Sequence, residues 1–408
     1  MVINMNILFL TMNNFDSIYE HSVYPDLIRA LAKKENKVTV LLPIEKKYGK
    51  QTDCENFGDI KVIKVRTGNL FDVGMKTKLI SRAGLCGKYE KALKVYAKGE
   101  KYELILSSTP PTILYPLINK IKKRDGAYSY LMLKDIFPQN AVDLGMISDG
   151  GIIHRFLRIF EKKLYASSDT IGCMSPANVR YLLEQDSWID VQKVTLCPNA
   201  HEVLPKREID RDGIRDKYGI SKGKIIFAYG GGIGRPQGID FFEECIRKID
   251  HSDKYMFVVM GLGSYADRLK ELSEQHKDLL MVIPWLPIDD FNDVVASSDV
   301  GLILLDHRFR IPNFPSRLLA YLQAGIPVFS STDENCDVGC ISEENGFGYW
   351  CISNDVDGFI RMLDKFDDEK KRRKMGINAR RFFEDNYDVD LVAESIIECV
   401  TGERREKI

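Results

Sequence analysis

The sequence predicts an α/β protein built from two similar halves, each a doubly wound parallel sheet. Short, continuous apolar runs alternate with segments whose apolar residues recur at helical spacing, which is typical of parallel sheets covered by helices on both faces. The alternation begins near the N-terminus and begins again after residue 200. A length of 408 residues is also sufficient for two or three domains.

The first half opens with the strand MNILFLT (5–11), and the helical pattern YPDLIRALAKKEN (24–36) follows it. Further strands are predicted at 37–42, 61–65, 102–108 and 127–133, with a helix at 113–126. Each of these strands is short and largely apolar. We therefore expect them to lie inside the sheet, with both faces covered.

The second half repeats this order after PNA (198–200) and a charged stretch. The strand KIIFAYGGG (224–232) leads into a glycine turn and a helix. The remaining strands are predicted at 255–261, 279–285, 299–305 and 326–331, and the helices at 239–249, 264–275 and 388–400. We expect one domain over 1–200 and a second over 201–385, with a C-terminal helix within 386–408 that crosses back to the first domain.

The composition favours a soluble, cytoplasmic protein. Hydrophobic residues make up 44% and charged residues 29% of the chain, as in ordinary globular proteins. Apolar runs such as VGLILL (300–305) have strand length and do not reach the ~18 residues of a membrane span. We expect no signal peptide at the N-terminus. The nine cysteines, odd in number and scattered, suit a reducing compartment.

The charge is divided unevenly between the halves. Residues 1–200 carry 29 basic and 21 acidic side chains, whereas residues 201–408 carry 29 and 38. The basic excess is concentrated in 61–103 and recurs in HRFLRIFEKKLYA (154–166). It is consistent with nucleic acid, with an anionic membrane or diphosphate lipid, or with an ordinary solvated helix face. Nucleic acid is disfavoured because the basic stretches lack interleaved aromatic residues.

A glycine-rich turn at FAYGGGIGRPQGIDFF (227–242) predicts phosphate binding. Its glycines are Gly230, Gly231, Gly232 and Gly234, and Arg235 follows them. Backbone N–H groups in such a turn approach an anion closely, and the following helix N-terminus attracts negative charge. The spacing matches neither the dinucleotide fingerprint nor the P-loop. A purely structural tight turn would explain one or two of these glycines.

Two later segments repeat the arrangement of strand, turn and helix. They are MGLGSYADRL (260–269), which contains Gly263, and NFPSRLLAYLQAGIPVFSS (313–331). In the second segment, Pro315 and Ser316 predict a helix start that places Arg317 in the first turn. Loops at the carboxyl ends of parallel strands converge on one crevice. The second half is therefore predicted to bind a diphosphate or a nucleotide.

With these segments in order, the chain resembles the retaining glycosyltransferases of family 4, which have the GT-B fold. The second half shows that family's glycine turn, GLGS, PWLP, SDVGLILL and the helix before AGIPV. The first half agrees through SSTPPTILYPL (107–117), KDIFPQNAVDLG (134–145), the helix FEKKLYASSDTIGCMSP (160–176) and TLCPNA (195–200). KDIFP and NFPSRLLAYL resemble the bacterial branch that acts on N-acetyl-L-fucosamine and related sugars in surface polysaccharides.

The resemblance implies two Rossmann-like domains that face a central cleft, with a nucleotide-sugar, most simply a UDP-sugar, in the second domain. Gly231, Gly232 and Gly234 would lie against the diphosphate, Gly263 would belong to the same donor site, and Arg317, with Arg235 nearby, would neutralise it. Backbone groups of Leu286 would read the uracil edge, beside Pro315 and Ser316 at the helix start. No metal or other cofactor is expected. Cys336, Cys340 and Cys351 lack an evident fourth zinc ligand.

Two departures from the family stand out. Pro312 and Ala320 occupy the positions of two family glutamates, the second of which binds the ribose hydroxyls. The family's Arg and Lys after the glycine strand fall on Gly231 and Gln237. Either the adjacent residues Asp306, Arg308 and Arg310 compensate, or donor binding is weak or altered, as in a catalytically inactive homologue.

The resemblance implies an acceptor site in the first domain. Asp135 is the candidate for orienting the acceptor hydroxyl, with Lys134 beside it and His21 facing the cleft; a structural Asp and a plain loop His are the alternatives. The acceptor would be a saccharide, free or on a polyprenyl diphosphate at the inner membrane face, in capsule or O-antigen synthesis. Basic residues in 76–101, with Leu79, Ile80 and Leu85, would then contact anionic lipid. A nucleotide-sugar 2-epimerase is the rival enzyme, while a nicotinamide dehydrogenase is excluded because the first strand lacks a glycine fingerprint.

Overall fold

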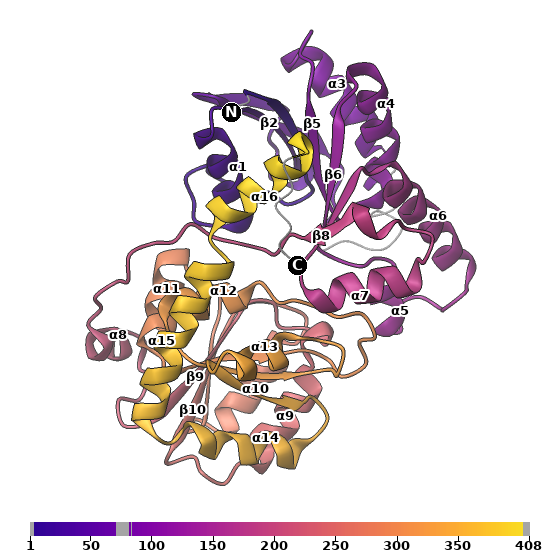
Figure 1. The fold of residues 1–408 in the computed structure, drawn as a ribbon. Coiled ribbons are helices and arrows are strands. Elements are labelled where there is room, and N and C mark those ends of the chain that lie inside the picture. Colours follow the sequence, from indigo (N-terminus) through magenta and orange to yellow (C-terminus); the bar gives the residue numbers. More distant parts are fainter. Residues whose placement is uncertain (1–3, 71–80, 83, 403–408) are drawn as a thin grey trace. The chain divides into compact units, whose positions relative to one another are not determined.

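A computed structural model describes residues 4–70, 81–82 and 84–402 of the chain (Figure 1). The chain divides into two compact units. Unit 1 comprises Met1–Glu202 together with Val389–Ile408, and unit 2 comprises Val203–Asp388. The sequence analysis placed the corresponding boundaries at 200 and 385. In both units helices cover a largely parallel sheet, so the predicted α/β class is confirmed.

The sheet of unit 1 has the strand order β3-β4-β2-β1-β5-β6-β7-β8. Its strands are β1 (Asn6–Leu10), β2 (Lys37–Glu45), β3 (Asp53–Phe57), β4 (Ile60–Thr67), β5 (Leu104–Ser108), β6 (Tyr128–Leu133), β7 (Thr170–Cys173) and β8 (Val194–Leu196). All neighbours pair in parallel except β3, which pairs antiparallel with β4 at the edge. The order reverses between β1 and β5, which makes this the topological switch point of unit 1.

The helices of unit 1 include one that returns from the far end of the sequence. They are α1 (Val23–Lys33), α3 (Leu85–Tyr96), α4 (Tyr115–Asp125), α5 (Gln139–Asp143), α6 (Ile152–Ser167), α7 (Pro176–Gln185) and α16 (Val389–Thr401). α16 lies against α1, buries Ile396 in the same core as Ile28, and forms the ion pair Lys34–Glu394 at 2.6 Å. The core of unit 1 is therefore completed only when residues beyond 388 are present.

One predicted helix is partly wrong. The segment 160–176 contains the end of α6, but the helix stops at Ser167 and strand β7 follows. Residues 170–173 pair in parallel with β6 and β8 and are fully buried. The short apolar run TIGC is thus used as an inner strand, because its burial on both faces of the sheet outweighs continuation of the helix.

The sheet of unit 2 has the order β11-β10-β9-β12-β13-β14, with all strands parallel. The strands are β9 (Ile225–Gly230), β10 (Tyr255–Met260), β11 (Leu280–Ile283), β12 (Val300–Leu304), β13 (Val328–Thr332) and β14 (Gly348–Ile352). This order is that of the doubly wound nucleotide-binding fold, and it reverses between β9 and β12. A ligand site is therefore expected beyond the carboxyl ends of β9 and β12.

Helices cover the sheet of unit 2, and aromatic side chains fill its centre. The helices are α8 (Arg211–Tyr218), α9 (Ile239–Lys248), α10 (Ala266–Gln275), α11 (Ile288–Ser297), α12 (Arg317–Ala324), α13 (Val338–Glu344), α14 (Val356–Leu363) and α15 (Glu369–Asn386). Phe227 stacks on Phe257 at 5.1 Å between ring centroids, and Phe329 lies 4.8 Å from Phe359. These rings belong to one buried cluster that joins three strands to α14.

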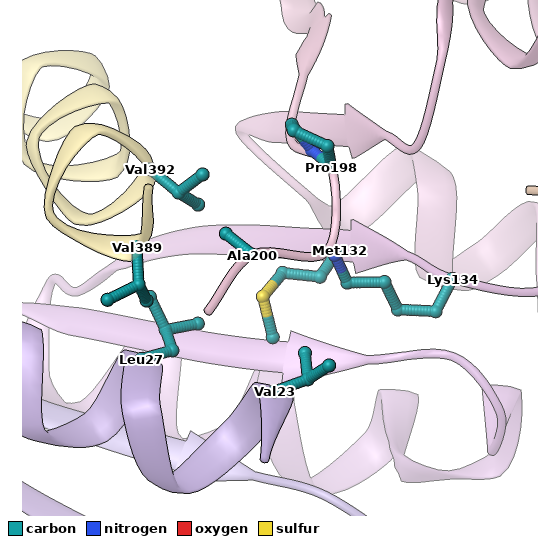
Figure 2. Close-up of a pocket in the computed structure, with 8 residues that line it drawn as sticks. All are labelled: Val23, Leu27, Met132, Lys134, Pro198, Ala200, Val389 and Val392. Carbon is teal, nitrogen blue, oxygen red and sulfur yellow. The ribbon is translucent and has the colours of Figure 1, made fainter. Parts of the chain in front are cut away.

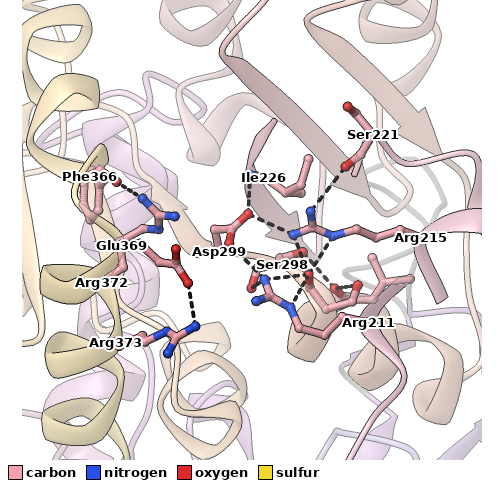
Figure 3. Close-up of polar contacts among 12 residues, drawn as sticks. Arg211, Arg215, Ser221, Ile226, Ser298, Asp299, Phe366, Glu369, Arg372 and Arg373 are labelled. Carbon is pink, nitrogen blue, oxygen red and sulfur yellow. Dashed lines mark hydrogen bonds and ion pairs between the residues drawn. The ribbon is translucent and has the colours of Figure 1, made fainter. Parts of the chain in front are cut away.

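A buried ion pair fixes α8 to the sheet (Figure 3). Arg215 donates to a carboxylate oxygen of Asp299 at 2.9 Å and to the Ser297 carbonyl at 2.8 Å. Asp299 also accepts the Ile226 N–H at 2.9 Å and pairs with Arg211 at 2.9 Å. Burial acts to raise the pKa of Asp299, but these hydrogen bonds and charges outweigh it and hold the pKa below its ordinary value.

The two chain crossings between the units begin at neighbouring points of unit 1. The chain leaves this unit after Glu202 and re-enters it at Val389. The Val389 N–H donates to the His201 carbonyl at 3.0 Å. The exit and the return are therefore tied together by a backbone hydrogen bond.

Candidate functional site

Four loops of unit 2 follow the carboxyl ends of adjacent parallel strands. The glycine turn at 231–234 follows β9, residues 261–265 follow β10, residues 284–287 follow β11, and residues 305–316 follow β12. Because the strands are parallel, all four loops lie at one edge of the sheet. The switch point between β9 and β12 lies within this edge, so the loops form the candidate site of unit 2.

The glycine turn is held by the neighbouring turn after β10. The N–H groups of Gly231 and Ile233 donate to the Met260 and Leu262 carbonyls, each at 2.9 Å. A Cβ at Gly263 would lie 2.0 Å from the Ile233 oxygen, so this position tolerates only glycine. The Gly231 amide is thus already used within the protein. Among the described residues, no hydrogen bond occupies the N–H group of Gly232 or Gly234.

Arg317, the first residue of α12, lies directly against this turn. Its guanidinium carbon is 4.3 Å from the centroid of the Tyr229 ring, and a Cβ at Gly231 would be 3.5 Å from it. The Tyr229 hydroxyl donates to the Gly232 carbonyl at 2.5 Å, which ties the ring to the turn. Burial raises the pKa of Tyr229, and the nearby positive charge of Arg317 offsets this only in part. The ring therefore stays neutral and supports the cation by its π face.

The Arg317 guanidinium has one nitrogen without a hydrogen-bond partner. Its Nη1 atom is buried and has no hydrogen-bond partner among the residues that the structure describes. Within the same residues, no carboxylate forms an ion pair with it. Leaving a buried N–H group without a partner is costly, and a guanidinium binds phosphate or carboxylate oxygens through directed N–H bonds. The arrangement of Arg317, Tyr229 and the glycine turn is therefore suited to a phosphate group.

The loop after β12 contains a closed ion pair. Asp306 is buried, and Arg308 donates to it through Nε at 2.7 Å. The Asp306 N–H donates to the Pro236 carbonyl at 3.0 Å, which fastens the loop to the segment after the glycine turn. Burial acts to raise the pKa of Asp306, but Arg308 lowers it by more. Asp306, Arg308 and Arg310 were considered as compensation for the missing family glutamates. Asp306 and Arg308 are bound to each other, and Arg310 is exposed.

The other predicted donor-site residues lie around the same edge and differ in exposure. Arg235 and Ser316 are exposed, while Leu286 and Pro315 are half-buried. Pro312 is buried in the loop after β12, and Ala320 is half-buried within α12. Gln237, which stands where the family has Lys, places its Oε1 atom 3.5 Å from where a Cβ of Gly234 would be. The side chain of Gln237 thus lies over the glycine turn.

Polar groups also gather at the switch point of unit 1. The Ser108 hydroxyl at the end of β5 donates to Thr11 Oγ1, after β1, at 3.3 Å. Thr109 Oγ1 accepts the N–H groups of Lys134 and Asp135 at 3.0 and 3.1 Å and donates to the Asp135 carbonyl at 2.9 Å. Thr109, which the sequence analysis missed, therefore fixes the KDIFP loop. A Thr that follows a buried strand was the signal that could have identified it.

The side chains of Asp135 and Lys134 differ in their hydrogen bonds. Burial raises the pKa of the Asp135 carboxyl, and no hydrogen bond to this carboxyl occurs among the described residues. The Lys134 ammonium donates to the Cys197 carbonyl at 3.0 Å, and burial lowers its pKa. The Lys134 side chain also lines a small cavity with Val23, Leu27, Met132, Pro198, Ala200, Val389 and Val392 (Figure 2). The Asp135 carboxyl thus has no hydrogen-bond partner among the described residues, whereas the amino group of Lys134 is bound to a backbone carbonyl.

His21 belongs to a charged cluster that its sequence position did not predict. Its Nδ1 atom lies 3.7 Å from Asp26 and 3.9 Å from Glu202, and His201 Nδ1 lies 2.8 Å from Asp26. Among the described residues, His21, Asp26 and Glu202 are the one set whose ligand atoms are close enough for a metal ion. Arg29, however, donates to both carboxylates. The guanidinium already supplies the balancing charge, so the set is poorly suited to a cation.

Of the three cysteines considered as zinc ligands, two form hydrogen bonds within the protein and one is exposed. The Cys336 thiol donates to the Asn313 carbonyl at 3.0 Å, the Cys351 thiol donates to the Ser331 hydroxyl at 3.5 Å, and Cys340 is exposed. Burial raises the pKa of Cys351 to about 11. A thiol must lose its proton to bind zinc, so this environment disfavours the metal.

The segment expected at a membrane needs one correction. Leu85 is fully buried in α3 and is not available to lipid, while Leu79 and Ile80 lie outside the described residues. Leu85 is buried because α3 turns its apolar stripe, including Tyr89 and Leu93, towards the sheet. Over the described residues, we find no helix with the length and hydrophobicity needed to span a bilayer.

Comparisons with known proteins point to one class of enzyme. Residues 210–382 match the family model of glycosyl transferases group 1. The chain is 25% identical to the probable glycosyltransferase WbjE of Pseudomonas aeruginosa, over 80% of this chain and 81% of that protein. It is 20% identical to the UDP-Gal:alpha-D-GlcNAc-diphosphoundecaprenol alpha-1,3-galactosyltransferase of Escherichia coli, over 62% and 65% of the two chains.

Solved structures agree on the fold. Sucrose-phosphate synthase from Thermosynechococcus elongatus superposes with a TM-score of 0.75 at 13% identity, covering 98% of this chain and 99% of that one. Anabaena Alr3699/HepE in complex with UDP-glucose gives 0.68 at 13% identity, covering 98% and 100%. The predicted GT-B fold is thereby confirmed, and the family match and the two relatives support a glycosyltransferase of group 1.

Proposed function

We propose that this chain is a retaining glycosyltransferase that moves a sugar from a UDP-sugar to a saccharide or a lipid-linked saccharide. We place this activity in the synthesis of a bacterial surface polysaccharide such as capsule or O-antigen. A solved structure with the same fold holds UDP-glucose, and one relative is named for a UDP-sugar donor and a diphosphoundecaprenol-linked acceptor. The proposal combines these similarities with the chemistry of the two switch-point sites.

The observation that carries the proposal is the half-buried Arg317 beside the glycine turn, whose buried Nη1 atom has no hydrogen-bond partner among the described residues. Two linked phosphates carry negative charge at neutral pH, and this charge increases on the leaving diphosphate as the sugar departs. Arg317 and the amides of Gly232 and Gly234 would hold that charge without reorganising, which is the largest single contribution in many transfer reactions. No metal is required for this role, and we propose that the reaction proceeds without one.

In the proposed reaction the bond between the sugar and the diphosphate weakens, and an oxocarbenium-like transition state develops. The acceptor hydroxyl attacks from the same face of the sugar that the diphosphate leaves. Its proton passes to a leaving phosphate oxygen, so no strong protein base is needed. The Asp135 carboxyl, which has no hydrogen-bond partner among the described residues, would accept the hydrogen bond of the acceptor hydroxyl and orient it.

Binding of UDP tests the donor site. Isothermal titration calorimetry should detect UDP binding by the wild-type protein, with at least a tenfold lower affinity for Arg317→Ala and an intermediate affinity for Arg317→Lys. The matched control is Arg373→Ala, because Arg373 is an exposed arginine of the same unit that pairs, among the described residues, with Glu369. Equal UDP affinity of wild type and Arg317→Ala, with both folded, would show that the donor site is assigned wrongly.

A specific observation supports one alternative, a catalytically inactive homologue that binds nucleotide-sugar. Pro312 and Ala320 stand where the resembled family has two glutamates, the second of which binds the donor ribose. Release of UDP from a panel of UDP-sugars, with and without saccharide acceptors and with EDTA present, separates the two functions. An enzyme releases UDP in the presence of EDTA, whereas an inactive homologue binds UDP and releases none.

A further inference from the structure

The two strands at the switch point of unit 2 separate before they end. β9 and β12 pair at two positions, the second of which joins Ala228 to Gly301. Beyond it β9 continues to Gly230 and β12 to Leu304, and each stays paired with its other neighbour, β10 or β13. If the parallel ladder between them continued, the Gly230 N–H would donate to the Leu302 carbonyl. The structure replaces this hydrogen bond with two others.

The Tyr321 hydroxyl of α12 lies between these two backbone groups. It accepts the Gly230 N–H at 3.2 Å and donates to the Leu302 carbonyl at 3.0 Å. Both groups thus keep a partner, as buried backbone groups require. Tyr321 is fully buried, and burial raises the pKa of its hydroxyl, so the proton that the second bond needs is retained. This arrangement, the Tyr321 bridge, inserts one oxygen atom between strands that would otherwise bond directly.

Two glycines make room for the bridge. A Cβ at Gly301 would lie 2.2 Å from Cγ of the Tyr321 ring, and a Cβ at Gly230 would lie 2.2 Å from Cε2 of Phe291 on α11. A larger residue at either position would displace a packed aromatic ring. The Tyr321 ring and the end of β9 are therefore held by close packing as well as by hydrogen bonds.

The helix that carries the bridge also carries the cation of the candidate donor site. Arg317 lies four residues before Tyr321, about one turn away on the same face of α12. The Arg317 guanidinium lies against the glycine turn and the Tyr229 ring, whereas Tyr321 binds the residue that precedes the turn. One helix thus fixes both the guanidinium and the end of β9, and with them the spacing between the two.

We propose that Tyr321 is a positioning residue for the donor diphosphate, which it does not itself touch. Its hydroxyl holds β9 and β12 apart at the switch point, so that the glycine turn and Arg317 are preorganised for two linked phosphates. The identity of the ligand rests on the proposed function, whereas the bridge itself is a property of the fold. Without the hydroxyl, the Gly230 N–H and the Leu302 carbonyl would stay unpaired or bond to each other. Either change would loosen or shift the turn relative to Arg317.

Tyr321→Phe tests the proposal because it removes the hydroxyl oxygen and keeps the packed ring. Isothermal titration calorimetry should show that the affinities for UDP and for inorganic pyrophosphate both fall by about tenfold, in line with the cost of a buried polar group left unpaired. The two factors should be equal, since the loss lies in the part of the site that binds phosphate.

The matched control is Tyr255→Phe. Tyr255 is also fully buried in unit 2, and its hydroxyl also forms two hydrogen bonds, to Asp364 at 2.9 Å and to Asp367 at 2.8 Å. It is the first residue of β10 and therefore lies at the opposite edge of the sheet from the candidate site. This variant should lose stability and keep the wild-type affinities for UDP and pyrophosphate, which separates positioning from a general loss of stability.

Hydrogen–deuterium exchange of the ligand-free proteins tests the bridge without UDP. The amides of residues 227–234 should exchange faster in Tyr321→Phe than in the wild type, because the Gly230 N–H loses its acceptor, and at the wild-type rate in Tyr255→Phe. The proposal is overturned if exchange in Tyr321→Phe is unchanged, if this variant binds both ligands as tightly as the wild type, or if Tyr255→Phe weakens binding equally. A wild type that binds neither ligand would instead overturn the proposed function, and the diphosphate with it.

Discussion

Arg317 and Asp135 are single side chains whose surroundings suit them to the proposed donor and acceptor roles. Arg317 is supported by the π face of Tyr229 and keeps a buried nitrogen unpaired. Thr109 fixes Asp135 through its backbone, while the Asp135 carboxyl has no hydrogen-bond partner among the described residues. In both residues neutral groups fix the position, and the charged end keeps an atom without a hydrogen-bond partner among the described residues. These positions are therefore the ones at which substitution should alter function more than stability.

The raised pKa of Asp135 predicts the pH dependence of transfer. Burial favours the protonated carboxyl, so the ionised form that accepts the acceptor hydrogen bond is lost at a higher pH than for an ordinary Asp. The rate should fall as the pH decreases through this raised pKa. Asp135→Asn should lower kcat/KM by about 10²-fold, as expected when the acceptor hydroxyl is misplaced, and should remove this acidic limb.

The measurement is a pH–rate profile of both proteins at subsaturating acceptor. UDP affinity serves as the control, because it should be the same for wild type and Asp135→Asn. An unchanged acidic limb in the variant would assign the titration to another group and refute the orienting role of Asp135.

At the scale of the element, the Arg215–Asp299 pair connects α8 to the strands that carry the candidate donor site. Asp299 accepts the N–H of Ile226, at the beginning of β9, and the glycine turn follows the end of the same strand. Removing one partner of a buried pair leaves the other charge uncompensated and costs about 3 kcal/mol. We therefore expect Asp299→Asn to lower the free energy of unfolding by about this amount at pH 7.

The pKa of Asp299 sets the direction of the pH effect. Its folded-state pKa is below that of the unfolded chain, so its contribution is complete above the unfolded pKa and is lost as the pH falls through the folded pKa. Urea unfolding should thus show a large difference between wild type and Asp299→Asn at pH 7, and a smaller one as the pH is lowered from about 5 to about 3. Asp216→Asn, which breaks the exposed pair with Lys222, is the control and should lower the free energy of unfolding far less than Asp299→Asn does. A pH-independent difference would contradict the electrostatic explanation.

The elements also show which structural features the sequence could predict. The inner strands were predictable because they are apolar throughout, as in β10 and β12, both buried at every position. Helix α15 was missed because only Gly376, Ala379 and Phe383 are buried in it, which leaves too thin an apolar stripe to recognise. The edge strand β3 was missed because none of its positions is buried and it contains Asp, Glu and Asn.

At the scale of the whole molecule, the repeated order of strand, turn and helix was sufficient to predict two doubly wound units, because that periodicity is local in the sequence. The donor-site candidates were also recognisable, since each follows a predicted strand. The support of Arg317 by Tyr229 was not, because a tyrosine inside a buried strand has the same pattern as an ordinary core residue. The His21 cluster was hidden for a different reason: Asp26 and His201 are 175 positions apart and meet only in the folded unit.

The hydrogen bond between His201 and Val389 has a practical consequence for dissecting the enzyme. The chain leaves unit 1 and returns to it at neighbouring points. Residues 203–388 are therefore a continuous insertion into unit 1. Deleting the insertion and joining Glu202 to Val389 by a few glycines should leave a stable remnant, and the excised piece should fold and bind UDP as an autonomous module. Circular dichroism melting of each fragment is the measurement. If either fragment does not fold by itself, the two units fold only together, as one cooperative structure.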